Sequence, residues 1–381
     1  ANWFFFFENF FVVFSSPSQH MSFVKNKKRP APLYGSYVLY GADESYFSMK
    51  LHSALSFVKN EIPFDFKGKT LTNREYLQKR SETHQIPVFR TPENWLIADT
   101  TPILHLLDSR LPKPIFYPPG FAGALVALFE EYFDEWIPRM AVHYRWFYPE
   151  TAKLLRKKIA LSSVDPGTPE DTIEMIGQGI NKWGLKACRA TGINTDNQRK
   201  QGEAELLRVL TKFDAHLAAG NKYFLGDRPS AFDAVVMGSL RAHFLLDPKP
   251  KAHIQHLTNI VEYSKRWETA SYDMDKLKCP TANQLKAMPF VNFLIKEIMG
   301  PFKTYSIATS KALENGDKSF VARIYDEDVS FLCRPYPTRS RKMMRSFIRH
   351  HLSSLEKLEW NAFLAQYGLD DTFGVPIQSK L

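Results

Sequence analysis

Apolar and polar residues follow two periods between residues 34 and 110. Short apolar runs at residues 37–40 and 62–66 predict two strands. A helix between them is predicted by apolar residues at spacings of three and four, namely Phe47, Leu51, Ala54, Leu55 and Val58. This order predicts parallel strands joined by a crossover helix, and a short polar helix at residues 73–80 follows.

The segment 81–107 reads as strand, turn, strand and helix. Ile86-Pro87-Val88 is apolar, but its proline lacks the N–H that a central strand needs. Residues 91–94 form a predicted turn, and residues 95–98 a second short strand. Asp99 and Thr100 are short polar residues that open a helix. The predicted order up to this point is therefore βαβαββα.

From residue 121 the pattern becomes helical. Residues 111–120 are rich in proline and predict a linker that connects without packing. One helix is expected over residues 121–148, kinked at Pro138, and further helices over 168–190 and 197–219. Ser230 and Asp233 form a predicted capping box at the start of an apolar helix.

The last hundred residues mix several patterns. Residues 289–311 predict a helix, residues 318–331 a strand or hairpin, and residues 339–367 a final basic helix. The basic positions of that helix are Arg339, Arg341, Lys342, Arg345 and Arg349. A solvated helix face is favoured over a phosphate contact, because neither a stacking-aromatic pattern nor a nucleic-acid motif accompanies them.

Three of these segments together resemble the glutathione S-transferase family: Ile86-Pro87, Asp99-Thr100 and residues 221–238. The resemblance covers residues 34–266. It implies an α/β thioredoxin-like N-terminal domain followed by an all-α C-terminal domain, the glutathione transferase fold. The expected division is a tail or leader at 1–33, a glutathione-binding domain at 34–110, a helical domain at 121–270, and an extension with an α/β-hairpin at 271–381 packed on the helical domain.

The resemblance also implies glutathione as co-substrate. A cis peptide bond before Pro87 would present the backbone of Ile86 to the tripeptide, with Gln85 beside it. Asp99 and Thr100 would hold the γ-glutamyl end at a helix start, whose free N–H groups favour a carboxylate. Weaker candidates for the glycine end are His84, Asn73 and Arg74.

Ser45 matches the family's thiol-activating position, with Ser48 and Lys50 in place and Tyr46 where proline is usual. The other reading of Ser45 is a plain helix cap, with Tyr40 or Tyr46 as the donor. Asp43 and Glu44 would oppose a thiolate. Since no cysteine occurs in this region, the cysteine of glutathione would be the nucleophile toward a small-molecule electrophile, as in detoxification.

The electrophile is expected against the helix at 121–148, where Trp136, Tyr144, Trp146 and Phe147 line either a pocket or a core. No metal-ligand cluster stands out. The alternative function is a non-catalytic interaction or assembly module. A homodimer is compatible with both the transferase and the interaction module.

Composition adds little to this picture. The 381 residues carry a net charge of +10, but basic and acidic residues are interspersed, so no nucleic-acid partner is implied. Cys188, Cys279 and Cys333 are far apart, which predicts a reducing compartment, the cytoplasm.

Residues 3–14 carry seven phenylalanines yet are too short to span a bilayer. They are expected to be a leader or a tail before a start at Met21, and a leader would favour an organelle. No other segment is long and apolar enough to span a membrane.

Overall fold

The computed structural model describes residues 35–270 and 275–377. The expected tail or leader and the start at Met21 lie outside these residues. In the described part of the chain, no helix has the combination of length and apolar composition that crossing a membrane requires.

The N-terminal half contains one four-stranded sheet. Its strands are β1 (Tyr37–Gly41), β2 (Phe64–Gly68), β3 (Val88–Arg90) and β4 (Leu96–Ala98), in the spatial order β2-β1-β3-β4. β1 is parallel to β2 and antiparallel to β3, and β3 is antiparallel to β4. With α1 (Tyr46–Phe57), α2 (Arg74–Ser81) and α3 (Thr100–Asp108), this is the predicted βαβαββα thioredoxin-like unit. β3 begins only after Pro87, because proline cannot donate to the ladder.

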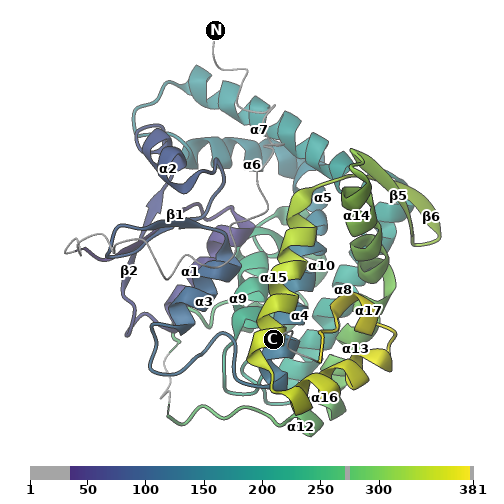
Figure 1. The fold of residues 1–381 in the computed structure, drawn as a ribbon. Helices are drawn as coiled ribbons and strands as arrows, with labels where there is room; N and C mark the ends of the chain where they lie inside the picture. The colour runs from purple at the N-terminus through teal and green to yellow at the C-terminus, as the bar shows by residue number, and fades with distance from the viewer. Residues whose placement is uncertain (1–34, 271–274, 378–381) are drawn as a thin grey trace.

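A helical domain follows the sheet and lies beside it in Figure 1. Its helices are α4 (Phe121–Glu135), α5 (Pro138–Trp146), α6 (Pro149–Ser162), α7 (Glu170–Ala190), α8 (Asp196–Ala218), α9 (Ala231–Ser239), α10 (Pro248–Ile254) and α11 (Thr258–Tyr263). The single kinked helix expected over 121–148 is wrong. The chain breaks at Trp136 and Ile137, and Pro138 opens a new helix, where its missing N–H costs nothing.

The two parts meet where α1 crosses α9. Gly238 allows this close approach, because a Cβ there would overlap the backbone of Lys50. The expectation that the proline-rich linker does not pack is also wrong. Phe116 and Tyr117 are buried, and the Asp108 carboxylate accepts hydrogen bonds from the N–H groups of Ile115, Phe116 and Tyr117 at 2.7, 2.9 and 2.8 Å. A buried segment outside regular structure needs such partners for its backbone.

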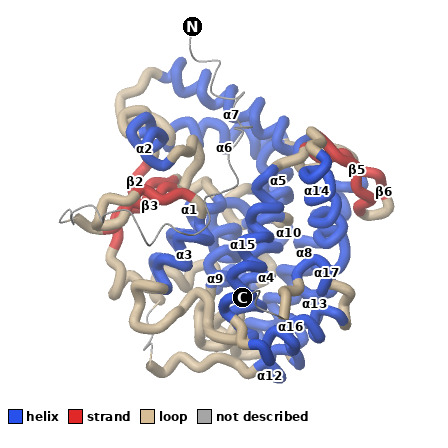
Figure 2. Tube along the Cα trace, in the orientation of Figure 1, coloured by secondary structure: helices blue, strands red, loops and turns tan. Residues whose placement is uncertain are grey.

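The C-terminal extension consists of a hairpin and several helices beyond the helical domain. Its elements are α12 (Ala282–Ala287), α13 (Pro289–Glu297), α14 (Lys303–Asn315), β5 (Ser319–Ile324), β6 (Glu327–Leu332), α15 (Pro335–His351), α16 (Ser354–Ala365) and α17 (Asp370–Phe373). Figure 2 shows the hairpin on the far side of the molecule from the sheet. The helix expected over 289–311 is interrupted at Gly300 and Pro301, and the one expected over 339–367 is broken before α16, which the Ser353–Glu356 capping box opens.

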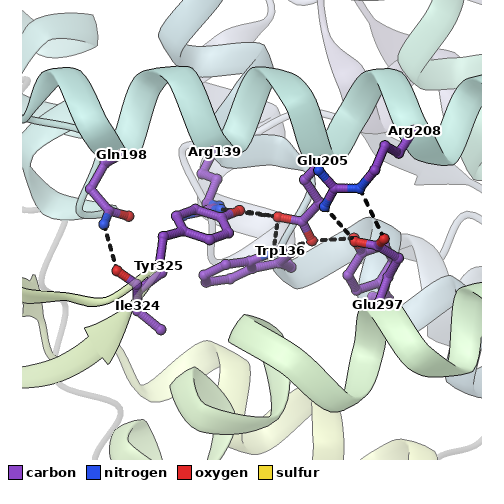
Figure 3. A network of polar contacts seen from close by, with 9 residues as sticks. Trp136, Arg139, Gln198, Glu205, Arg208, Glu297, Ile324 and Tyr325 are labelled. Carbon is purple, nitrogen blue, oxygen red and sulfur yellow. Dashed lines mark hydrogen bonds and ion pairs between the residues drawn. The ribbon is translucent and has the colours of Figure 1, made fainter.

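The hairpin is held to the helical domain by a buried polar network (Figure 3). The Tyr325 hydroxyl, in the turn between β5 and β6, donates to the carboxylate of Glu205 on α8. Gln198 of α8 donates from Nε2 to the carbonyl oxygen of Ile324 at 2.8 Å. The same Glu205 carboxylate accepts from Tyr132 and Trp136, so one buried acid joins α4, α8 and the extension.

Two of the five basic residues of α15 make internal contacts, whereas Arg339 and Lys342 are exposed as expected for a solvated face. Arg341 donates to the carbonyl oxygen of Ser306 at 2.6 Å, and Arg345 donates to that of Gly374 at 2.8 Å. α15 packs on α4, where Ser340 donates to the Glu131 carboxylate at 2.5 Å. The extension therefore reaches α4, the helix whose Glu130 and Asp134 pair with Lys50 of α1.

Candidate functional site

The strand register brings the predicted site residues to one end of the sheet. Tyr40 of β1 lies opposite Val88 of β3, and Val88 lies opposite Ala98 of β4. One residue farther along each strand come Gly41, Pro87 and Asp99. The Ile86–Pro87 peptide bond is cis, and Gly41 leads within four residues to Ser45 at the start of α1. The ends of three neighbouring strands therefore carry the predicted features side by side.

The main chain of Ile86 is open for pairing. Within residues 35–270 and 275–377, no hydrogen bond to its N–H or C=O is found. The loop before it is held by Lys69, whose ammonium donates to the carbonyl oxygens of His84 and Gln85 at 2.9 and 3.2 Å. Burial, and then the charge of Arg74, lower the pKa of Lys69 to about 8. Sequence reasoning missed Lys69, because no local pattern marks a lysine that acts on a loop sixteen residues later.

The Ser45 hydroxyl caps α1 through its oxygen and keeps its hydrogen available as a donor. Its Oγ accepts the N–H of Ser48 at 3.3 Å, which makes it the N-cap of α1. Among the described residues, no acceptor is found for its own hydroxyl hydrogen. The two readings of Ser45 are therefore compatible, because capping uses a lone pair whereas thiol activation would use the hydrogen.

The negative charges of the two acidic residues before Ser45 are reduced, one by an ion pair and the other by solvent. The Glu44 carboxylate lies 3.2 Å from the ammonium of Lys158, and the Glu44 carbonyl oxygen accepts from Arg145 at 2.6 Å. Asp43 is exposed to solvent, which screens its charge. The unfavourable field expected at Ser45 from these two carboxylates is thus reduced by cations from α5 and α6.

The two tyrosines considered as alternative donors are engaged elsewhere. Tyr46 is buried, and its hydroxyl donates to the carbonyl oxygen of Phe133 at 2.7 Å. Burial and the charge of Asp134 raise the pKa of Tyr46 well above its ordinary value. Tyr40 belongs to a small core with Val38, Leu77 and Val88. Ser45 is consequently the better donor of the three.

Asp99 and Thr100 open α3 at the same end of the sheet. Asp99 has a φ of 78°, makes no side-chain cap, and its Oδ2 is buried without a hydrogen-bond partner in the described chain. The Tyr336 hydroxyl of α15 and the charges of Lys50 and Arg339 act to lower the pKa of its carboxyl. Burial outweighs these contacts and raises the pKa of Asp99. No local signal predicts Tyr336 here, since it belongs to the extension.

The remaining candidates have other roles: the aromatic residues belong to the core or to the surface, and Asn73 forms hydrogen bonds with backbone groups. Trp136, Tyr144 and Trp146 are 1, 2 and 4% exposed, so they belong to the core and do not line an electrophile pocket. Phe147 is exposed, and Arg199 lies over its ring. Asn73 accepts from the N–H of Thr70 and donates to the carbonyl oxygen of Gly68, which fixes the turn before α2.

Comparisons with known proteins agree with this architecture. Residues 209–267 match the family model described as glutathione S-transferase, C-terminal domain, which confirms the predicted resemblance to that family. No curated protein matches the chain.

Three similar solved structures, all at low identity, come from different organisms. The first is a glutathione transferase of Phanerochaete chrysosporium, with 14% identity, a TM-score of 0.42 and coverage of 63% of this chain and 99% of the other. A Methylobacterium radiotolerans transferase in complex with glutathione sulfonate has 18% identity, a TM-score of 0.38 and coverage of 65 and 97%. A maleylacetoacetate isomerase of Anaeromyxobacter dehalogenans with bound glutathione has 18% identity, a TM-score of 0.35 and coverage of 62 and 94%.

Proposed function

We propose that this protein, whose helical domain resembles that of glutathione S-transferases, binds glutathione and activates its thiol for attack on a small electrophile. One observation carries the proposal: the strand register aligns Ser45, the open backbone of Ile86 and the start of α3 at one end of the sheet. We also propose residues 34–110 as the glutathione-binding domain, 121–270 as the helical domain and 271–381 as the extension.

Each part of the tripeptide has a matching group at this end of the sheet. The Ile86 backbone pairs with the cysteinyl residue, as in the addition of a strand to a sheet, while Gln85 flanks it. The Asp99 carboxylate accepts from the γ-glutamyl ammonium, and Thr100 with the first N–H groups of α3 holds the γ-glutamyl carboxylate. The Ser45 hydroxyl donates to the sulfur, which then attacks the electrophile as a thiolate.

Replacing Asp99 by asparagine should weaken glutathione binding. A charge-assisted hydrogen bond contributes about 1.5–3 kcal/mol, which corresponds to a loss of roughly tenfold to a hundredfold in affinity. Isothermal titration calorimetry with glutathione measures this effect. The matched control is Asp65→Asn, since Asp65 lies on β2, away from the aligned strand ends. Equal affinities of the Asp99 and Asp65 variants would exclude the assigned γ-glutamyl contact.

Replacing Ser45 by alanine should raise the pKa of the bound thiol by about one to two units, because a hydrogen bond to the thiolate is lost and each unit corresponds to about 1.4 kcal/mol. The thiolate absorbance of bound glutathione, titrated against pH, reports this pKa directly. Ser45→Thr keeps both the cap and the donor and should restore the wild-type titration. Tyr46→Phe should leave the thiol pKa unchanged, because its hydroxyl donates to Phe133.

The same measurements separate catalysis from a non-catalytic interaction module. That alternative draws support from α15 of the extension, whose Tyr336 influences the pKa of the Asp99 carboxyl and so lies close to the proposed site. If glutathione binds but neither the wild type nor Ser45→Ala shows a thiolate near neutral pH, the protein binds the tripeptide without activating it. If glutathione does not bind at all, the interaction module is the better description.

A further inference from the structure

A second candidate binding site lies beside α1, close to β2. It is a cleft of about 270 Å³ lined by Asp43, Met49, His52, Arg241, Leu246 and Trp267. The His52 ring contacts Phe64 and Phe66 of β2, so the cleft opens on the β2 side of the sheet. The candidate glutathione site instead lies where β1, β3 and β4 end. The two sites adjoin at the loop between β1 and α1, where Asp43 precedes Ser45 by two residues, but no residue assigned to glutathione lines the cleft.

Arg241 supplies a cation that no carboxylate of residues 35–270 and 275–377 neutralises by direct contact. Its guanidinium carbon lies 3.8 Å from the centroid of a Trp267 ring, and its Nη1 donates to the Ser53 hydroxyl at 2.8 Å. None of the ion pairs among the described residues involves Arg241, and Asp43 and Glu268 attract it only from a longer range. Burial dominates and lowers its pKa to about 10. A partly desolvated cation without a carboxylate contact is costly, so an anion bound beside it is favoured.

Apart from Asp43, the rest of the lining is apolar and aromatic. Met49 is 2% exposed, and the rings of His52 and Trp267 meet edge to face with centroids 5.1 Å apart. Burial, and then the charge of Arg241, lower the pKa of His52 to about 4, so its imidazole is neutral near pH 7. The cleft therefore offers one positive charge within aromatic walls, and its volume is slightly below the range typical of drug-sized ligands.

We propose that this cleft binds a small aromatic carboxylate. The carboxylate pairs with the Arg241 guanidinium, whose planar fork matches it, while the ring packs against Met49, Leu246 and Trp267. Asp43 at the rim disfavours a second negative charge, which selects monoanions. Binding here does not depend on glutathione, so the proposal goes beyond the function assigned above and stands without it.

The test compares 2-naphthoate with its neutral analogue 2-naphthalenemethanol by isothermal titration calorimetry on the full chain. The wild type should bind naphthoate about tenfold or more tightly than the alcohol. Arg241→Gln should abolish this preference while leaving the affinity for the alcohol within about twofold, which also shows that the cleft remains folded. The control Lys265→Gln removes an exposed charge nearby and should preserve the preference.

Two further variants act on other parts of the cleft. Asp43→Asn removes a negative charge from the rim and should strengthen naphthoate binding by about twofold to fivefold. Leu246→Trp fills the cleft and should abolish binding of both probes. Equal wild-type affinities for the two probes, an unchanged preference in Arg241→Gln, or displacement of naphthoate by glutathione would overturn the proposal.

Discussion

Replacing Glu205 by alanine is expected to lower the free energy of unfolding by about 3–5 kcal/mol, because removing one partner of a buried ion pair leaves the other charge uncompensated. Glu205 is 1% exposed and Arg139 is 4% exposed, with Nη2 of Arg139 3.3 Å from the carboxylate. Tyr132 at 2.5 Å and Trp136 at 3.0 Å, together with Tyr325, also lose their acceptor. Figure 3 shows Trp136, Arg139 and Tyr325 around the Glu205 side chain.

Urea unfolding followed by tryptophan fluorescence measures this loss. The matched control is Arg208→Ala, which breaks the neighbouring ion pair with Glu297 at 3.0 Å, where the Arg208 side chain is 49% exposed. Partly exposed pairs contribute about 0–1 kcal/mol, so the control should lose much less. Tyr325→Phe should cost about 1 kcal/mol, since Glu205 keeps its other donors. Comparable losses for Glu205→Ala and the control would show that the network is not a stability centre.

The second large effect concerns pH. Glu131 is buried on α4, where desolvation raises the pKa of its carboxyl to about 8, against an attenuating hydrogen bond from Ser340. The charges of Asp134 and Glu130 on the same helix add to the increase, and that of Arg341 opposes it. Burial likewise raises the pKa of Asp134 to about 7, even though the Lys50 ammonium lies 2.5 Å from it. With Glu130 also 2.7 Å from Lys50, one cation faces two acids, which favours a proton on Asp134.

Because both pKa values are raised in the folded protein, the free energy of unfolding should fall as the pH rises. A carboxyl whose pKa is raised in the folded state keeps its proton after the unfolded chain has released it, at about pH 4.3 for glutamate. Its contribution to stability is fully present below that pH and is lost as the pH rises through the folded pKa. The loss amounts to at most about 1.4 kcal/mol per pH unit for each retained proton. The wild type should therefore become less stable between about pH 4 and 8, through Asp134 and Glu131.

Glu131→Gln should remove its share of this slope, because glutamine cannot ionise but can still accept from Ser340. Unfolding free energies of the wild type and the variant, measured at intervals from pH 5 to 8.5, give the difference in slope. The variant should gain stability relative to the wild type as the pH rises, and most clearly near pH 8. The control Glu150→Gln removes an exposed carboxyl and should follow the wild-type curve. Parallel curves for all three proteins would show that Glu131 ionises normally.

Much of the candidate site could be predicted from short stretches of sequence. The proline after Ile86, the polar pair Asp99-Thr100 and the cap at Ser45 are local signals, since each depends on the backbone of a few neighbouring residues. The parts that were missed act across the chain. Lys69 holds the loop before Pro87, and Tyr336 reaches Asp99 from the extension. Neither Lys69 nor Tyr336 stands in a periodic pattern or at a helix cap, so no local signal in the sequence marks them.

The wrong predictions have a similar origin. The linker was expected not to pack, but the Asp108 carboxylate accepts three of its backbone N–H groups and allows it to be buried. For the aromatic residues Trp136, Tyr144 and Trp146 the sequence leaves a pocket and a core open, because both give the same periodicity. Only the helices packed around them show that they are buried.

The sequence by itself determined the order βαβαββα, the helical domain that follows and the hairpin of the extension. Strand and helix periods and caps are set by interactions within a few residues, so they can be recognised without the fold. The tertiary structure decided which charges are buried together: Lys50 between Glu130 and Asp134, Glu205 beneath Tyr325, and Arg241 against Trp267. The free energy of a charge depends on its partners and on its distance from water, and both are fixed only when distant elements pack.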